Sequence, residues 1–110
     1  MMDWAKTDEL IRPILEIIIQ EASPEKVILF GSRATGKSRP DSDFDFMVVV
    51  KGIQNEREIS RKINRALLDH KIPYSVDVVV VRDSTFHKHE DSPFYVYHQA
   101  KLEGKIYYER

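Results

Sequence analysis

Two aspartates stand two residues apart at the start of an apolar stretch of this sequence. Asp43 and Asp45 open the run that continues from Phe46 to Val50. Residues two apart on a β-strand project from the same face, so these carboxylates would lie side by side, with Cα atoms about 6 to 7 Å apart. Without a partner they would repel each other, and the apolar neighbours would raise at least one pKa. A bound divalent cation would remove both effects.

A third aspartate repeats this pattern. Asp77 lies within Ser75 to Val81, a segment that otherwise contains five valines and one serine. If the two acidic strands are neighbours in one sheet, the side chain of Asp77 can join the other two on one face. Three convergent carboxylates would form an oxygen-ligand site suited to Mg²⁺, which readily accepts phosphate oxygens as well. A triphosphate would complete such a site.

The segment before the aspartate pair could hold the phosphates. Gly31 and Ser32 follow directly on an apolar run, and Gly36 adds a second flexible point. Glycine lets the backbone approach a phosphate closely, and exposed N–H groups with the Ser32 hydroxyl can donate to its oxygens. Positive charge is added nearby by three basic residues, Arg33, Lys37 and Arg39. The spacing fits neither a Walker loop nor the glycine pattern of a dinucleotide fold.

These side chains need elements to position them, and the hydrophobic pattern predicts alternating helices and strands. Helical spacing of apolar residues occurs in two segments, 7–22 and 54–70. Apolar runs indicate strands in three segments, 27–30, 43–50 and 75–81. The first is typical of a buried strand, and the five valines of the third favour a central strand. Thr7 is the expected N-cap of the first helix. Pro13 must either bend that helix or delay its true start to near Arg12.

The pattern weakens after Arg82. The expected features there are a polar segment over 85–91, a short helix over 93–102 and a last strand over 104–108. There are no internal repeats and no linker, so we expect a single domain over residues 1–110. Its class is α/β in the mixed α+β sense, a small mixed β-sheet flanked by helices in the order α-β-(turn)-β-α-β-α.

Two further features have plainer explanations than a catalytic role. His87, His89 and Glu90 lie close together, but without cysteine and without an evident fourth ligand they indicate a surface loop rather than a metal site. The three consecutive isoleucines at 17–19 give the first helix more apolar width than one buried stripe requires. This width indicates an oligomeric or partner interface.

Composition limits the remaining classes. The 110 residues include 17 basic and 18 acidic side chains and no cysteine, for a formal charge of −1. This balance does not predict direct binding of nucleic acid, and the lack of cysteine agrees with a reducing cytoplasm. No apolar segment approaches the length of a signal sequence core or a membrane span. We therefore expect a cytoplasmic protein without membrane contact.

Taken together, the glycine-serine turn at 31–32, Gly36, the Asp43-x-Asp45 strand and the separate Asp77 resemble the DNA polymerase β-like nucleotidyltransferase superfamily. The length and element order are similar to its minimal branch. The resemblance extends from the first helix to Val81, with weaker support from Gly104 to Tyr108. The four elements agree in residue type and order, which makes the match specific. Many relatives have arginine where this chain has Thr35, and this difference weakens one expected phosphate contact.

The resemblance implies a nucleotidyltransferase fold and a role for each matched residue. Asp43 and Asp45 would hold two Mg²⁺ ions, and Asp77 would complete the site of the ion that activates the acceptor hydroxyl. Gly31, Ser32, Arg33 and Gly36 would bind the phosphates of ATP. The reaction implied is transfer of AMP to a hydroxyl. Minimal relatives often act as antitoxins of HEPN-type toxins, with a toxin tyrosine as one acceptor, in a homo- or hetero-oligomer.

Two other functions stay open at this stage. The chain could be a non-catalytic antitoxin that neutralises a partner by covering it, although the presence of Asp77 argues against that reading. It could also adenylylate an antibiotic, which the same catalytic core allows, although a larger chain is expected for that activity.

Overall fold

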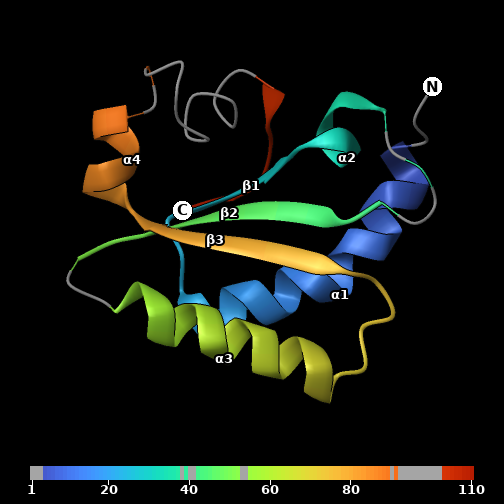
Figure 1. The fold of residues 1–110 in the computed structure, drawn as a ribbon, viewed down its shortest axis with the longest axis horizontal. Coiled ribbons are helices and arrows are strands. Elements are labelled where there is room, and N and C mark those ends of the chain that lie inside the picture. Colours follow the sequence, from blue (N-terminus) through green and yellow to red (C-terminus); the bar gives the residue numbers. More distant parts are fainter. Residues whose placement is uncertain (1–3, 38, 40–41, 53–54, 90, 92–102) are drawn as a thin grey trace.

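The chain folds into a four-stranded β-sheet with helices on both faces (Figure 1). The computed structural model describes residues 4–37, 39, 42–52, 55–89, 91 and 103–110. The elements in chain order are α1 (Trp4–Ala22), β1 (Lys26–Phe30), α2 (Ser32–Thr35), β2 (Phe44–Val50), α3 (Glu56–Asp69), β3 (Val76–Arg82), α4 (Asp83–His89) and β4 (Lys105–Glu109). The expected class, a small mixed sheet flanked by helices, is confirmed.

The strand order of the sheet is β3-β2-β1-β4. Strand β3 therefore lies at the edge of the sheet and is only partly buried, so the central position that its valine-rich sequence predicted is wrong. Strand β1 pairs antiparallel with both β2 and β4, whereas β2 and β3 are parallel. Helix α3 makes the crossover that a parallel pair requires, and the starts of β2 and β3 therefore lie at the same end of the sheet (Figure 1). The beginnings of the two acidic strands meet there.

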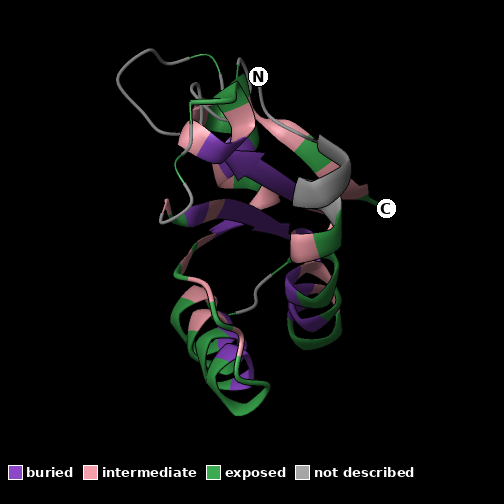
Figure 2. Cartoon of the chain, turned by 90° about the vertical axis from the view of Figure 1, so that its right-hand side faces the viewer, coloured by how far each residue is buried: buried purple, intermediate pink, exposed green. Residues whose placement is uncertain are grey.

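The two faces of the sheet have different coverings. One face packs against α1 and α3, and its core includes Val27, Leu29, Phe44, Phe46 and Val48. The other face carries a smaller apolar cluster that includes Met47, Val49, Val81 and Phe86 of α4. Figure 2 shows the buried strands as a layer above α1 and α3, whose outer sides are exposed. Among the described residues, the α4 face has the smaller apolar cluster.

The first helix differs from its prediction at its start. It begins at Trp4, so Thr7 lies inside the helix and is not its N-cap. Helix α1 also continues through Pro13, on an exposed side where water can satisfy the carbonyl freed by the missing N–H. Ile17 and Ile18 are buried within this chain, and Ile19 is half-buried. Two of the three isoleucines therefore belong to the core, and their apolar width is explained without an interface; the interface itself stays a prediction.

The segment after Arg82 also differs from its prediction. Residues 83–89 form α4, so His87 and His89 lie on a helix and not in a loop. The buried Phe86 explains the difference, because it anchors this polar turn to the sheet. The last strand is confirmed at 105–109, and the helix expected over 93–102 lies outside the described residues. Among the helices described, none is both long and apolar enough to cross a membrane.

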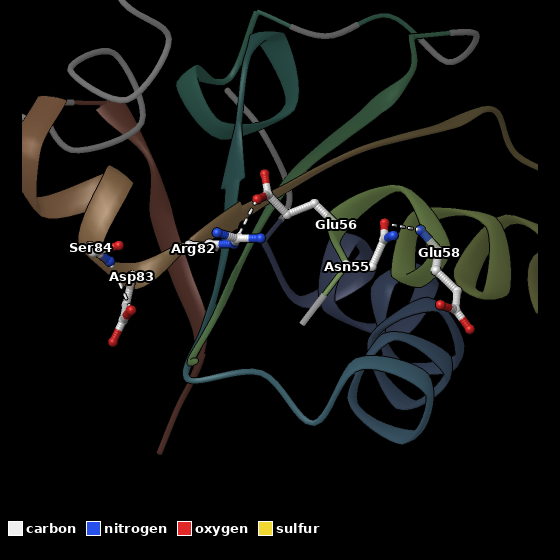
Figure 3. A network of polar contacts seen from close by, with 6 residues as sticks. All are labelled: Asn55, Glu56, Glu58, Arg82, Asp83 and Ser84. Carbon is white, nitrogen blue, oxygen red and sulfur yellow. Dashed lines mark hydrogen bonds and ion pairs between the residues drawn. The ribbon is translucent and has the colours of Figure 1, made fainter. Parts of the chain in front are cut away.

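Polar contacts fix the end of the β2–α3–β3 unit that lies away from the aspartates (Figure 3). The Asn55 side chain caps α3 by accepting a hydrogen bond from the Glu58 N–H at 3.1 Å. Arg82, at the end of β3, forms an ion pair of 3.0 Å with Glu56 in the first turn of α3. The crossover helix is thereby held to the strand that follows it.

Candidate active site

The three aspartates project from the same face of the sheet. Asp45 and Asp77 are paired in register across the parallel strands β2 and β3. Neighbouring strands are about 4.8 Å apart, and paired residues point to the same side. Asp43 precedes β2 by one residue and is exposed, so strand alternation places it on the side of Asp45. Phe44, between them, is fully buried on the opposite side against α1 and α3.

Electrostatic coupling supports this convergence. The pKa of Asp45 is raised above its ordinary value of 3.8, first by burial and then by the negative charges of Asp77 and Asp43. A side-chain hydrogen bond with Asp77 also favours the protonated form and raises the pKa further. The Asp45 carboxylate is therefore a group whose ionised form would be stabilised by a nearby cation.

The carboxylates do not form a ready-made metal cage. Across the described ranges, no three histidine, cysteine, aspartate or glutamate side chains are gathered tightly enough to hold a metal ion by themselves. Mg²⁺ usually keeps several waters and binds through one or two carboxylates plus phosphate oxygens. Asp45 and Asp77, paired in register with Asp43 nearby, fit such an open site because they supply carboxylate oxygens without closing it. The assignment of these three residues as metal ligands stays a prediction.

The glycine-serine turn lies directly against this acidic group. Gly31 has a φ of +75°, and a β-carbon added to it would come within 3.3 Å of the Asp45 Cγ and overlap Oδ2. The single turn α2 follows, with the Ala34 N–H donating to the Gly31 carbonyl at 3.0 Å. The first N–H groups of a helix have no acceptor within it. The missing side chain of Gly31 thus lets the start of α2 approach the Asp45 carboxylate.

The other residues predicted to bind phosphate occupy different positions. Gly36 has a φ of +80° and ends α2 as its C-cap, where its N–H donates to the Ser32 carbonyl. Ser32 is half-buried, whereas Lys37 and Arg39 are exposed. Arg33 is buried and donates two hydrogen bonds to the Ser42 carbonyl. The structure therefore brings Gly31 to the carboxylates but gives Gly36 and Arg33 contacts within the fold.

Sequence reasoning missed two residues that shape this end of the sheet. The Tyr74 ring packs edge-on against the Phe44 ring, with centroids 5.6 Å apart. The Ser42 hydroxyl accepts a hydrogen bond from the Arg39 N–H at 2.7 Å and closes the loop before β2. An aromatic residue just before the valine-rich segment was the available signal for Tyr74. The backbone contact of Ser42 has no sequence signature.

A mixed sheet of this order, with paired aspartates beside a glycine turn, defines a nucleotidyltransferase fold. The family model described as polymerase beta, nucleotidyltransferase matches residues 12–110. The chain therefore belongs to the polymerase β nucleotidyltransferase family, and this membership places it among the transferases. None of the curated proteins matches the chain.

Solved structures agree with this assignment. A Sulfolobus solfataricus protein with a provisional nucleotidyltransferase assignment is 25% identical, with a TM-score of 0.62 over 93% of this chain and 79% of that one. An MNT antitoxin in complex with a tri-AMPylated HEPN toxin from Shewanella oneidensis is among the similar structures, at 18% identity, with a TM-score of 0.56 over 94% and 72%. A toxin-antitoxin structure with AMP-PNP is 21% identical, with a TM-score of 0.55 over 89% and 73%. At these lower identities the likeness shows the fold.

Replacing Asp45 by asparagine should stabilise the protein when divalent cations are absent. Because the pKa of Asp45 is raised on folding, its protonated form favours the fold at low pH. That contribution is lost as pH rises from the ordinary value of 3.8 through the folded-state pKa. At pH 7 in EDTA we expect the melting temperature of Asp45→Asn to exceed that of wild type by about 2 °C or more. The difference should shrink near pH 4.

The same thermal measurement with Mn²⁺ completes this prediction. The cation should raise the melting temperature of wild type but not that of Asp45→Asn, because the variant lacks the carboxylate whose ionised form the cation would stabilise. Asp69→Asn, an equal charge change at the exposed end of α3, is the control and should respond to Mn²⁺ as wild type does. A variant less stable than wild type in EDTA would contradict the expectation.

Proposed function

We propose that this chain is a divalent-metal-dependent nucleotidyltransferase that transfers AMP from ATP to a hydroxyl of a partner protein. The observation that supports it most strongly is the juxtaposition of Asp45, Asp77 and the Gly31 turn at one end of the sheet. A metal–triphosphate ligand needs acidic side chains that bind the metal and a glycine turn that binds the phosphates. Enzymes of this family generally use nucleoside triphosphates and divalent metals, and we take Mg²⁺ as the metal.

Each group has a role in the proposed reaction. An acceptor hydroxyl oxygen forms a bond to the α-phosphorus of ATP, the bond from that phosphorus to the bridging oxygen breaks, and pyrophosphate leaves. Gly31 and the start of α2 would bind the phosphates, and Asp43, Asp45 and Asp77 would hold the metal ions. Bound there, divalent ions would supply charge neutralisation for the displacement. The acceptor proton passes to Asp77 or to solvent.

We further propose that the acceptor is a tyrosine of a HEPN-type toxin and that the chain acts as the antitoxin in the cytoplasm. Support comes from the similar fold of an MNT antitoxin bound to a tri-AMPylated HEPN toxin. The similar toxin-antitoxin fold with AMP-PNP supports an adenine nucleotide as donor. The single-domain organisation over 1–110, predicted from sequence, is part of this proposal.

A non-catalytic role is the second candidate, in which the chain neutralises its partner by covering it. The similar fold of an MNT antitoxin in complex with a HEPN toxin supports this candidate too, because covering a partner requires a direct complex of that kind. The two candidates differ in whether the partner is modified. They also differ in whether neutralisation needs the carboxylates.

Transfer of labelled phosphate separates the two candidates. The chain is incubated with Mg²⁺, the protein encoded by the adjacent gene and ATP labelled at either the α- or the γ-phosphate. We expect the partner to take up the α-label and not the γ-label. EDTA and the double variant Asp43→Asn/Asp45→Asn should abolish uptake. If the double variant neutralises the partner as well as wild type does and neither transfers label, the enzymatic proposal is wrong and covering is correct.

A further inference from the structure

Arg33 makes an unusual set of contacts for a basic residue beside a phosphate site. It is the only charged residue that is buried among those whose side chains the structure describes, at 7% exposure. Its Nε and Nη2 donate to the Ser42 carbonyl oxygen at 3.2 and 2.9 Å. Its guanidinium carbon lies 4.2 Å from the centroid of the Phe44 ring. Both contacts are made to the backbone or ring of the segment that begins β2.

The position of the guanidinium directs it away from the acidic face. Phe44 projects from β2 on the side of α1 and α3, opposite to Asp45. A guanidinium that lies over the Phe44 ring is therefore on the far side of the strand from the carboxylates. A phosphate bound beside Asp45 would be separated from Arg33 by the strand itself. This arrangement does not suit the phosphate contact predicted from the sequence.

The same contacts hold the residues on both sides of Asp43. Ser42 precedes Asp43 and Phe44 follows it. Arg33 therefore contacts both sequence neighbours of Asp43, through the Ser42 carbonyl and the Phe44 ring. The Phe44 N–H donates to the Ser75 carbonyl at 2.9 Å, which joins the start of β2 to the segment before β3. The Phe44 ring also packs against the ring of Tyr74, the residue that precedes Ser75. Fixing Phe44 thus fixes the spacing between the two acidic strands.

We propose that Arg33 is a positioning residue, which sets the place of Asp43 and the separation of β2 from β3 through Ser42 and Phe44. The catalytic part of this inference rests on the proposed function. A planar guanidinium can donate twice to one carbonyl and stack on a ring at once. Lysine keeps the charge but cannot donate the same pair of hydrogen bonds and stack on the ring at once. Arg33→Lys therefore tests the geometry of the guanidinium separately from its charge.

Hydrogen exchange of the ligand-free protein tests the positioning directly. In Arg33→Lys we expect the amide of Phe44 to lose protection at least about tenfold, while that of Val48, in the middle of β2, changes less than about threefold. Affinity for Mn²⁺ alone should fall at least about tenfold, as is usual when a residue that supports metal ligands is altered. Arg61→Lys on the exposed side of α3 is the matched control and should change neither quantity.

Kinetics distinguish positioning from phosphate binding. Arg33→Lys should lower kcat for AMP transfer at least about tenfold and change KM for ATP less than about threefold. A mainly raised KM with unchanged Phe44 protection would overturn the proposal in favour of phosphate contact. Equal loss of protection at Phe44 and Val48 would overturn it in favour of a general structural role. If wild type transfers no nucleotide, the proposed function fails, and the exchange and Mn²⁺ measurements still decide the role of Arg33.

A second variant covers the case in which Arg33→Lys does not fold. Phe44→Leu removes the ring beneath the guanidinium and keeps an apolar side chain in the core. The amide of residue 44 should again lose protection relative to that of Val48, and Mn²⁺ affinity should fall. Unchanged local protection and Mn²⁺ affinity in this variant would overturn the proposal.

Discussion

Replacing Asp77 by asparagine should reduce AMP transfer at least about 100-fold, which corresponds to about 2.7 kcal/mol of lost transition-state stabilisation. The reason is the position of Asp77, paired with Asp45 across the parallel strands and exposed at the open end of the sheet. Asparagine preserves the shape of the side chain but removes the charge needed for the acceptor's metal ion or proton. The rate is measured as single-turnover transfer of α-labelled phosphate to the partner protein.

The nucleotide itself should still bind to Asp77→Asn. Asp43, Asp45 and the Gly31 turn remain, so we expect affinity for a Mg²⁺–ATP analogue to change less than about threefold. Asp69→Asn carries the same loss of charge at the far end of α3 and should transfer at the wild-type rate. Transfer by Asp77→Asn within about threefold of wild type would show that this carboxylate has no catalytic role.

Gly31→Ala should abolish transfer while leaving most of the fold in place. An alanine at this position would have to adopt a φ of +75° and a ψ of −159°, a region that strains other residues by about 1–3 kcal/mol. Its β-carbon would also displace the Asp45 carboxylate, because it would lie within 3.3 Å of Cγ. A misplacement of about 1 Å at a reacting group can lower a rate about 100-fold. Urea unfolding and label transfer measure the two effects separately.

Gly52→Ala is the matched control for this substitution. Gly52 has a similar positive φ of +87°, but an added β-carbon there would have no atom within 4 Å. Both variants should lose stability because alanine is strained at a positive φ, and only Gly31→Ala should lose transfer. Equal transfer by the two variants would contradict the role of Gly31 in admitting the carboxylate.

The site strands were predictable because their signals are local and strong. A run of valines interrupted by one aspartate has few physical explanations, and the structure places that aspartate, Asp77, beside Asp45 as expected. The class of fold followed from the same alternation of apolar runs and amphipathic segments. The crossover by α3 then made the two acidic strands parallel neighbours.

The parts that escaped prediction depend on tertiary contacts. Helix α4 is a polar segment whose single buried anchor, Phe86, gives no periodic pattern in seven residues. Arg33 was predicted to bind phosphate because it is basic and follows the glycine-serine turn. The direction of its side chain, however, is set by contacts with the Phe44 ring and the Ser42 carbonyl. The catalytic assignments themselves stay predictions, to be decided by the substitutions above.

The pairing of Asp45 with Asp77 has a consequence for how the chain finds its fold. Strand β3 is almost uniform valine, so apolar packing alone would tolerate a shift of one residue against β2. Such a shift would turn Asp77 toward α1 and α3 and bury a charge among side chains that cannot solvate it. Asp77, which we propose to take part in catalysis, therefore also disfavours the shifted pairing of β3 with β2. Asp77→Val would remove this penalty, so β3 could pair with β2 in more than one register and the protein would be more prone to aggregate.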